Sequence, residues 1–462
     1  MSEQPEISRL VTAVFGAWQQ SGINFLILRN YEGLPDFAGN DIDVLVHPAQ
    51  LREAEGVLLA AARNAGFRLH NRVEFATLAL YLSSQQGTTQ THFDLFTALK
   101  WRGFDLLACE GFLERKASRG LFSVPHPADE TAAKLLASMI YTGKVKEKYR
   151  QSLVAGFLAE PAATTRLLAE TYGQANAEFL VAAGAKADWA LIEARTGALR
   201  RALILRQLTR RPGRTLKSAL RLAGRLAGRL RWPPGLTLVL CGADGSGKST
   251  AARAILDGLS STFPPQKVRH FHWKPTLFTA RRQGMRGPAT DPHGQPPRNP
   301  AISLCYFALH WLEFFLGSYL RIRPVTFRGG LVLIDRYYYD FFVDQRRYRL
   351  AVPRFIIRVG QMFLKQPDLI VLLDAPGAVL QARKQEVSLA ETERQRAAYR
   401  QMVEGLSNGC IVDATLPPEQ VGAEIKRAVL DFMAARTVKR WGAELAGLPG
   451  ARQPPKAAAQ PG

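Results

Sequence analysis

The chain has 462 residues, of which 47% are apolar and 22% charged, and this composition excludes a chain that is disordered throughout. Its net charge is +22, which favours anionic partners such as nucleotides, nucleic acid or an anionic membrane surface. The four cysteines lie far apart and form no Cys-x-x-Cys pair, which argues against a disulfide framework or a zinc ribbon. Because the first residues show no export signal, we expect a cytoplasmic protein.

The first part of the chain has the pattern of an α/β domain, predicted over residues 1–125. Apolar residues at helical spacing predict two helices, and short alternating runs predict strands. The helices are expected at 7–20 and 50–65, and the strands at 24–28, 41–46, 76–82 and 91–96. Residues 126–200 have only helical periodicity, which predicts a helical subdomain.

Acidic residues occur at alternate positions in the strand predicted at 41–46. Asp41 and Asp43 therefore point to one face of that strand, and a later strand carries Asp94. Three carboxylates on neighbouring strands can hold two Mg²⁺ ions that bridge a triphosphate. We predict Asp41, Asp43 and Asp94 as metal ligands. The alternative is that they are ordinary acids at strand ends.

Residues 201–234 form a predicted basic, amphipathic linker. Between Arg200 and Arg231 there are eleven Lys or Arg and no Asp or Glu. A helix turns by about 100° per residue, which places apolar residues on one face: Leu216, Leu220, Ala223, Ala227 and Leu230. The opposite face carries the basic residues Lys217, Arg221, Arg225 and Arg229. A plain tether and a helix that binds an anionic membrane through residues 201–231 are equal alternatives. Nucleic acid ranks third, because no nucleic-acid-binding motif accompanies the charge.

The strongest motif lies between a predicted buried strand at 236–240 and a helical run. The pattern Gly-x-x-x-x-Gly-Lys-Ser, in a strand–loop–helix context, predicts a loop whose backbone N–H groups bind phosphates. Its candidate nucleotide-binding residues are Gly242, Asp244, Gly245, Ser246, Gly247, Lys248, Ser249 and Thr250. Lys248 would reach the β- and γ-phosphates of ATP, and the Ser249 hydroxyl would bind Mg²⁺.

Further charged residues follow at strand ends. An apolar strand ends in Asp335-Arg336, which places a carboxylate for Mg²⁺ and a cation for an anionic acceptor near the loop. A helix predicted over residues 378–404 carries Arg383, Lys384, Arg394, Arg396 and Arg400. Its cations can act as a lid over phosphoryl groups or form a solvated surface.

Residues 235–436 resemble the thymidylate kinase branch of the P-loop kinases. The resemblance rests on CGADGSGKST, LIDRYYYD, QPDLIVLLDAP and GCIVDATLPPEQVGAEIKRAV. It implies a three-layer α/β/α fold with a parallel sheet, and ATP and Mg²⁺ as cofactors. It also implies that Lys248, Asp335, Arg336 and Arg383 are catalytic, and that Asp244 contacts the acceptor.

Residues 23–97 resemble the nucleotidyltransferase superfamily, with Asp41, Asp43 and Asp94 as the implied metal ligands. That family usually has a Gly-Ser turn after the first strand. Here the stretch is Leu28–Gly33, in which Arg29 is the candidate phosphate contact. An alternative is a degenerate or regulatory domain.

The acceptor side departs from thymidylate kinases. The helix before Asp335 carries His310, Trp311 and Glu313 but no arginine before Arg321, and it is aromatic-rich. Its apolar length raises the question of a membrane span, and we expect a core helix instead. The loop at 276–300 resembles an insertion and contains Arg281, Arg282, Arg286 and Arg298.

We therefore expect a cytoplasmic protein, peripheral at the inner membrane face if the linker binds lipid, with a disordered tail at 437–462. Its kinase domain would transfer the ATP γ-phosphoryl to a sugar, nucleotide-sugar or lipid-linked acceptor in surface polysaccharide assembly, as the resemblance to such fusions implies. The alternatives are a dTMP kinase and a nucleotide-binding membrane scaffold without turnover. A second copy of the chain, in a homodimer, is a further candidate partner.

Overall fold

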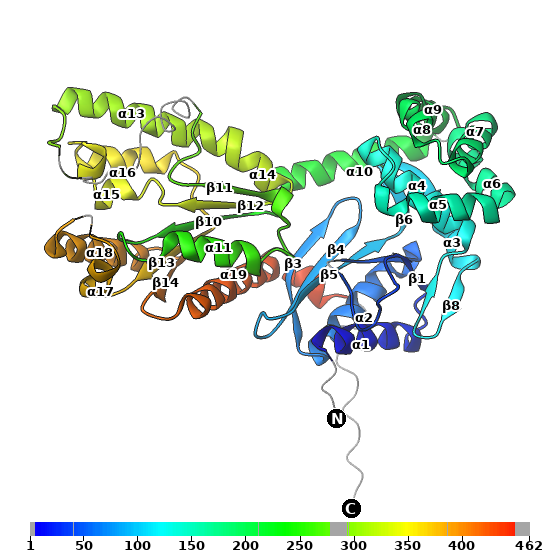
Figure 1. The fold of residues 1–462 in the computed structure, drawn as a ribbon, viewed down its shortest axis with the longest axis horizontal. Helices are drawn as coiled ribbons and strands as arrows, with labels where there is room; N and C mark the ends of the chain where they lie inside the picture. The colour runs from blue at the N-terminus through cyan, green and yellow to red at the C-terminus, as the bar shows by residue number, and fades with distance from the viewer. Residues whose placement is uncertain are drawn as a thin grey trace, which may run out of the picture. The chain divides into compact units, whose positions relative to one another are not determined.

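The computed structural model describes residues 5–39, 41–210, 212–277, 293, 295–385 and 387–448. The chain divides into two compact units (Figure 1). Unit 1 comprises Met1–Ala227 together with Ala434–Gly462, and unit 2 comprises Gly228–Met433. Each unit has its own sheet and its own cores.

Unit 1 is built on a five-stranded mixed sheet in the order β1-β2-β5-β4-β3. Strands β2 and β5 are parallel, and the other neighbours are antiparallel. The strands are β1 (Phe25–Arg29), β2 (Asp41–Val46), β3 (Phe67–Glu74), β4 (Leu78–Ser84) and β5 (Gln90–Phe96). On one face, Ile27, Val44 and Phe93 share a core with α1 (Glu6–Gln20) and α2 (Leu51–Asn64).

The other face of this sheet is covered by the helical part of unit 1. Leu26, Leu28 and Leu45 join the core of that part, because side chains alternate along each strand. Its helices are α3 (Glu110–Glu114), α4 (Pro127–Thr142), α5 (Glu147–Ala159), α6 (Pro161–Tyr172), α7 (Gln174–Ala185), α8 (Trp189–Ala194) and α9 (Thr196–Arg210). Asp41 and Asp43 have the parity of Leu45 on β2, so they point to the helical side.

Two short hairpins complete unit 1. One pairs β6 (Ala98–Trp101) with β7 (Phe104–Ala108), and the other pairs β8 (Ala117–Arg119) with β9 (Phe122–Val124). The β6–β7 hairpin contributes Trp101, Leu106 and Leu107 to the core of the helical part.

The segment predicted as a basic linker forms the end of α9 and the whole of α10 (Pro212–Arg231). Leu203 of α9 is buried in the helical part. On α10, Leu216 and Leu220 are 63% and 65% exposed, whereas Arg225 donates to Glu74 and to the Phe75 carbonyl. Lys217 and Arg221 are exposed as well, whereas Ser218, Leu222, Arg225 and Leu226 are partly covered. The covered side of α10 within unit 1 therefore contains both leucine and arginine, which differs from the two sides that periodicity separates.

Unit 2 contains a parallel five-stranded sheet in the order β11-β12-β10-β13-β14. The strands are β10 (Leu236–Cys241), β11 (Val268–Phe271), β12 (Leu331–Asp335), β13 (Leu369–Asp374) and β14 (Gly409–Asp413). The three central strands are buried along their whole length, as expected when helices cover both faces of a sheet.

The two faces of this sheet have separate cores, which makes unit 2 a three-layer α/β/α domain (Figure 1). Leu238 and Leu240 face one core, and Val239 and Cys241 face the other. The helices are α11 (Lys248–Gly258), α13 (Pro300–Gly317), α14 (Arg323–Phe327), α15 (Asp340–Val343), α16 (Arg354–Met362), α17 (Gly377–Arg383), α18 (Leu389–Glu404) and α19 (Pro418–Ala446).

Helix α19 takes the chain from unit 2 back into unit 1. In unit 1, Thr437 Oγ1 donates to the His70 carbonyl at 3.0 Å, and the Arg72 guanidinium lies 4.4 Å from the centroid of the Trp441 ring. Residues 437–446 are thus helical, which differs from the disordered tail predicted from 437. The Pro- and Gly-rich composition behind that prediction begins only at Gly447. Residues 449–462 lie outside the described residues.

One helix among the described residues, Pro300–Phe327, is long and apolar enough to cross a membrane by length and composition. A core helix passes the same test. Phe307, Glu313 and Phe314 of this helix are buried, but only 33% of its apolar window is buried, and Ile302, Leu304 and Leu309 are exposed, so the core helix stays a prediction.

Candidate active site

The phosphate-binding loop connects β10 to α11, as predicted. Gly242 and Gly245 have φ angles of 145° and 83°, where side chains rarely fit. A Cβ atom at Gly242 would lie 2.6 Å from the Leu373 carbonyl oxygen, and one at Gly245 would lie 2.5 Å from that of Leu380. Only glycine fits at either position, so the loop keeps the open backbone that binds phosphate oxygens.

Lys248, at the start of α11, reaches back over this loop. Its Nζ donates to the carbonyl oxygens of Gly242 and Ala243, both at 2.8 Å, and lies 3.3 Å from Ser246 Oγ. Burial, together with the nearby charge of Arg336, lowers the pKa of Lys248 to about 8. The ammonium group is therefore held in the loop and charged at neutral pH.

This lowered pKa predicts that the affinity for ATP depends on pH. ATP phosphates bind the ammonium form of Lys248, so the affinity for ATP is highest below pH 8, where this form predominates. The affinity falls as the pH rises through 8, because Lys248 of the free protein then loses its proton. The Kd of ATP should rise by up to about tenfold per pH unit above that value. Calorimetry between pH 7 and pH 9.5 measures the change. The Lys248→Arg variant should show a flat profile, since its side chain stays charged, and a flat wild-type profile would contradict the prediction.

Asp335 ends β12, where it pairs with Leu240 just before the loop. It is 2% exposed, and its Oδ1 accepts no hydrogen bond from any described residue. Its Oδ2 lies 3.2 Å from His270 Nε2 and 3.5 Å from His272 Nδ1. Burial opposes ionisation, but hydrogen bonds from both histidines lower the pKa of Asp335 to about 2. An ionised carboxylate with a free buried oxygen, in the pocket that Ser249 also lines, fits a magnesium ion.

Arg336 adopts a left-handed backbone with a φ of 64°, an unusual conformation for a residue with a side chain. Its backbone N–H donates to the Leu240 carbonyl at 2.8 Å. Its guanidinium pairs with Asp244 and lies 3.4 Å from Asp340. Arg347 pairs with the other carboxylate oxygen of Asp244. Two arginines thus converge on one acid beside the phosphate loop.

The arginine-rich segment forms two helices, α17 and α18, where one helix over 378–404 was predicted. The break occurs because Lys384 is extended and Ser388 caps α18, its side chain accepting from the Glu391 N–H. Arg383 lies on the pocket side and donates to the Ala414 carbonyl. Arg396 and Arg400 pair instead with Asp374, and Arg394 with Glu391. Of the predicted lid cations, therefore, Arg383 and Lys384 reach the pocket.

These groups line one cavity of about 530 Å³ in unit 2. Its lining residues are Asp244, Gly245, Gly247, Lys248, Ser249, Thr250, His272, Asp335, Arg336, Arg347, Arg383 and Lys384. Gly242 and Ser246 lie in the loop but outside this lining. His272 and Arg347 were not among the site residues predicted from the sequence. His270 lies in β11 and His272 directly follows the end of that strand, and residues two apart along an extended chain lie on one face.

Comparison with known proteins bears on this site. A thymidylate kinase of Thermosynechococcus vestitus is 30% identical over 229 residues, which covers 45% of this chain and 90% of that protein. The chain belongs to the thymidylate kinase family. A thymidylate kinase of Chromohalobacter salexigens is 28% identical over 174 residues, covering 36% of this chain and 77% of that protein. No family model matches the chain. The relatives support a P-loop kinase-like function.

The helix expected to carry the acceptor pocket, α13, uses its polar residues in a buried cluster. Glu313 is fully buried and pairs with Lys274, which is 3% exposed and whose Nζ lies 2.7 Å from His310 Nδ1. None of the three lines the cavity at the phosphate loop. Of the arginines in the insertion-like loop, Arg298 donates to the Tyr348 carbonyl, whereas Arg281, Arg282 and Arg286 lie outside the described residues.

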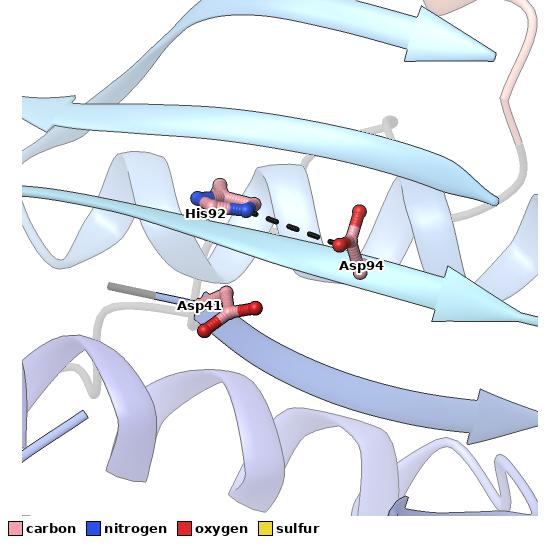
Figure 2. Close-up of side chains that lie close together, drawn as sticks. All are labelled: Asp41, His92 and Asp94. Carbon is pink, nitrogen blue, oxygen red and sulfur yellow. Dashed lines mark ion pairs between the residues drawn. The ribbon is translucent and has the colours of Figure 1, made fainter. Parts of the chain in front are cut away.

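Unit 1 brings its three predicted acids together. The parallel pairing of β2 with β5 sets Asp43 opposite Asp94, and Asp41 opposite His92. Ligand atoms of Asp41, His92 and Asp94 lie within 4.8 Å of one another (Figure 2). Thr77 Oγ1 donates to Asp94 at 3.2 Å. His92, which has the same parity on β5 as Asp94, was not among the metal ligands predicted from the sequence.

Asp43 links this cluster to Arg29. It is 1% exposed; its Oδ2 pairs with Arg29, and its Oδ1 has no hydrogen-bond partner among the described residues. Burial, and then the charges of Asp43 and Asp41, raise the pKa of Asp94. A buried free oxygen among mutually repelling carboxylates fits a divalent cation. Arg29, the candidate phosphate contact, is thus placed beside the acids.

Proposed function

We propose that unit 2 is a Mg²⁺-dependent phosphotransferase that transfers the γ-phosphoryl group of ATP to an acceptor. The observation that carries this proposal is the convergence of Lys248, Asp335 and Arg336 on one cavity at an intact phosphate loop. Membership of the thymidylate kinase family supports the same reaction class. Catalysis then consists mainly of positioning and of charge neutralisation.

Each residue has a separate task in this proposal. The loop N–H groups and Lys248 hold the β- and γ-phosphates of ATP. Asp335 and the Ser249 hydroxyl would hold Mg²⁺, which neutralises charge on the phosphates when it is bound. Arg336 and Arg347 orient the acceptor from one side, and Arg383 stabilises charge on the transferring group from the other.

We infer that the acceptor carries an anionic group. The guanidinium groups of Arg336 and Arg347 both pair with the Asp244 carboxylate. A phosphate group of the acceptor can replace this carboxylate as the partner of the two arginines. A sugar phosphate, nucleotide-sugar or lipid-linked phosphate is our first choice, because the polar residues of α13 are engaged in the buried Lys274–Glu313 cluster. A dTMP acceptor is the alternative.

An acceptor panel tests the proposal. Release of ADP from Mg·ATP is measured with dTMP, other nucleoside monophosphates, sugar phosphates, nucleotide-sugars and polyprenyl-linked phosphates, with Lys248→Ala as the blank. Lys248-dependent stimulation by dTMP alone would establish the alternative. No Lys248-dependent turnover with any acceptor would refute a kinase and favour a nucleotide-binding scaffold.

We propose nucleotidyl transfer as a second function, located in unit 1. The observation that favours it is the acidic cluster, in which Asp43 and Asp94 are paired across parallel strands and one buried oxygen is free. Two cations held by such carboxylates bridge a triphosphate and an acceptor hydroxyl. Arg29 would hold the phosphates.

The double variant Asp41→Asn, Asp94→Asn should lose divalent-cation binding in unit 1. We leave Asp43 in place, because removing it would strand the Arg29 charge. Mn²⁺ titrations followed by electron paramagnetic resonance should show a fall in bound Mn²⁺ per chain and an affinity loss of about tenfold or more. Glu178→Gln, an exposed acid on α7, is the matched control. Unchanged Mn²⁺ binding in the double variant would refute the metal assignment.

A further inference from the structure

Unit 2 has an exposed apolar surface on two neighbouring helices, α13 and α16, which neither proposed activity uses. The two helices lie next to each other (Figure 1), and the Trp311 side chain of α13 donates to the Gly360 carbonyl of α16 at 2.9 Å. We call their exposed apolar residues the α13–α16 surface. Its main members are Ile302, Leu309, Leu312, Phe355, Val359 and Met362.

Helix α13 has two different sides. Its inner side buries Phe307 and Phe314, and the buried Glu313 on that side pairs with Lys274. Its outer side is also apolar but is exposed to solvent. An apolar helix normally has apolar surroundings on all sides. Because the buried ion pair holds the inner side on unit 2, the helix fits a position on a membrane and not across it.

Helix α16 has its apolar stripe on the exposed side. Phe355, Val359 and Met362 are spaced at i, i+4 and i+7, so they share one face. They are 67%, 51% and 78% exposed, whereas Ile357 is the buried residue of the helix. In a helix that only covers its own domain, the large apolar side chains face the core. The stripe of α16 faces away from unit 2, which is typical of a surface that contacts an apolar partner.

The charges around this surface have one sign. Residues 296–367 are described throughout, and all their acids are buried: Glu313, Asp335, Asp340 and Asp344. The exposed charged residues of the same stretch are Arg321, Arg328, Arg346, Arg354 and Arg358. The last two lie on α16 beside its apolar stripe. Apolar side chains bordered by cations alone complement a bilayer with anionic headgroups.

The same charges disfavour a second copy of the chain as the partner. Two copies that met through this surface would bring arginines of α16 toward each other with no exposed acid of residues 296–367 to pair with them. Like charges brought together at an interface oppose association. An anionic lipid surface offers the opposite charge.

We propose that the α13–α16 surface binds an anionic membrane. The apolar side chains of both helices enter the boundary between headgroups and acyl chains, and Arg354 and Arg358 pair with lipid phosphates. The proposal goes beyond phosphotransfer by unit 2 and does not depend on it. It also assigns membrane binding to residues outside the basic segment 201–231.

The test is cosedimentation of the full chain with vesicles of equal parts of phosphatidylcholine and phosphatidylglycerol. The double variant Phe355→Ser, Met362→Ser should lower the partition coefficient by about tenfold or more, because two inserted side chains are lost. The double variant Arg354→Gln, Arg358→Gln should lower it by about 30-fold, because two cations near the headgroups are lost.

Matched controls come from exposed residues elsewhere in unit 2. Leu389→Ser on α18 is the apolar control, and the double variant Arg253→Gln, Arg427→Gln is the charge control. Both should change the partition coefficient less than about twofold, since charges farther than a Debye length from the lipid are screened. All variants should keep the wild-type Kd for ATP, which shows that unit 2 is folded. Equal vesicle binding by the surface variants and the controls would overturn the proposal.

The oligomeric state tests the competing partner. In sedimentation velocity without lipid, the wild type and the Phe355→Ser, Met362→Ser variant should have the same mass. A wild-type dimer that becomes a monomer in this variant would assign the surface to a second copy and overturn the proposal.

A fluorescent probe on α13 provides a further measurement. Cys305 is exposed on α13, whereas Cys109 and Cys241 are buried, so an environment-sensitive dye can be attached to it in a Cys410→Ser background. Its emission should shift to the blue when the vesicles are added, and lipids with a nitroxide on the acyl chain should quench it. An unchanged emission from vesicle-bound protein would contradict the proposal.

Discussion

Replacing Lys248 with alanine should abolish phosphoryl transfer, lowering kcat/KM by about a thousandfold or more. The Nζ group is held over the loop by the Gly242 and Ala243 carbonyl oxygens, so it is already positioned when ATP binds. Its removal takes away the cation that meets the β- and γ-phosphates. The measurement is ADP release with the acceptor that the panel identifies, together with single-turnover transfer of a labelled γ-phosphoryl group.

Lys267→Ala is the matched control for this variant. Lys267 belongs to the same unit, is exposed, and lies outside the cavity at the phosphate loop. It should keep wild-type kinetics. If Lys248→Ala retained more than a tenth of the wild-type rate, the loop would not be the site of transfer.

Replacing Arg336 with methionine should remove phosphoryl transfer and also destabilise unit 2. Asp340 is 1% exposed, and it faces Arg336 together with the hydroxyl groups of Tyr348 and Tyr399. Removing one partner of a buried pair leaves an uncompensated charge, which costs about 3–5 kcal/mol. The two tyrosine hydroxyls still stabilise the Asp340 charge in part, so we expect the free energy of unfolding to fall by about 3 kcal/mol, the lower end of that range.

Thermal unfolding of the full chain measures this loss. The transition of unit 2 should move down by several degrees, because about 1 kcal/mol shifts the midpoint of a domain of this size by about 2–4 °C. Arg346→Met, an exposed arginine on the same stretch, is the control and should leave the midpoint unchanged. A Tm shift no larger than that of the control would show that Arg336 is not required to compensate the buried charge of Asp340.

The local motifs were readable from the sequence because short-range chemistry determines them. The loop from Gly242 to Thr250 needs glycine at two left-handed or crowded positions and a lysine at the helix start, and all these lie within nine consecutive residues. Asp41 and Asp43 share a face because side chains alternate along any strand. Asp335-Arg336 stands at the carboxyl end of a buried strand. In a parallel α/β sheet this end lies beside the loop that follows the neighbouring strand, which here is the phosphate-binding loop.

The partners of these residues were decided by the tertiary structure. Arg347 meets Asp244 from a segment 103 residues away, and no local pattern marks it among the arginines of the chain. Asp94 lies opposite Asp43 only because β5 inserts between β2 and β4, which is a matter of sheet order. Long-range pairings of this kind depend on how whole elements pack, and single-sequence periodicity does not contain that information.

Helix α10 and helix α19 show the same limit. The periodicity of α10 distinguished a leucine side from an arginine side, but the partly covered side in unit 1 contains Leu222 and Leu226 together with Arg225. Glu74 and the Phe75 carbonyl accept the hydrogen bonds of Arg225. The end of α19 is helical because Thr437 and Trp441 pack against β3, although the tail was predicted to be disordered from residue 437. The sequence by itself determined the chemistry of the phosphate loop, the alternating acids and the α/β pattern. Which faces are covered, and which charges meet, followed only from tertiary packing, because burial is decided by the partner element and not by the element that carries the pattern.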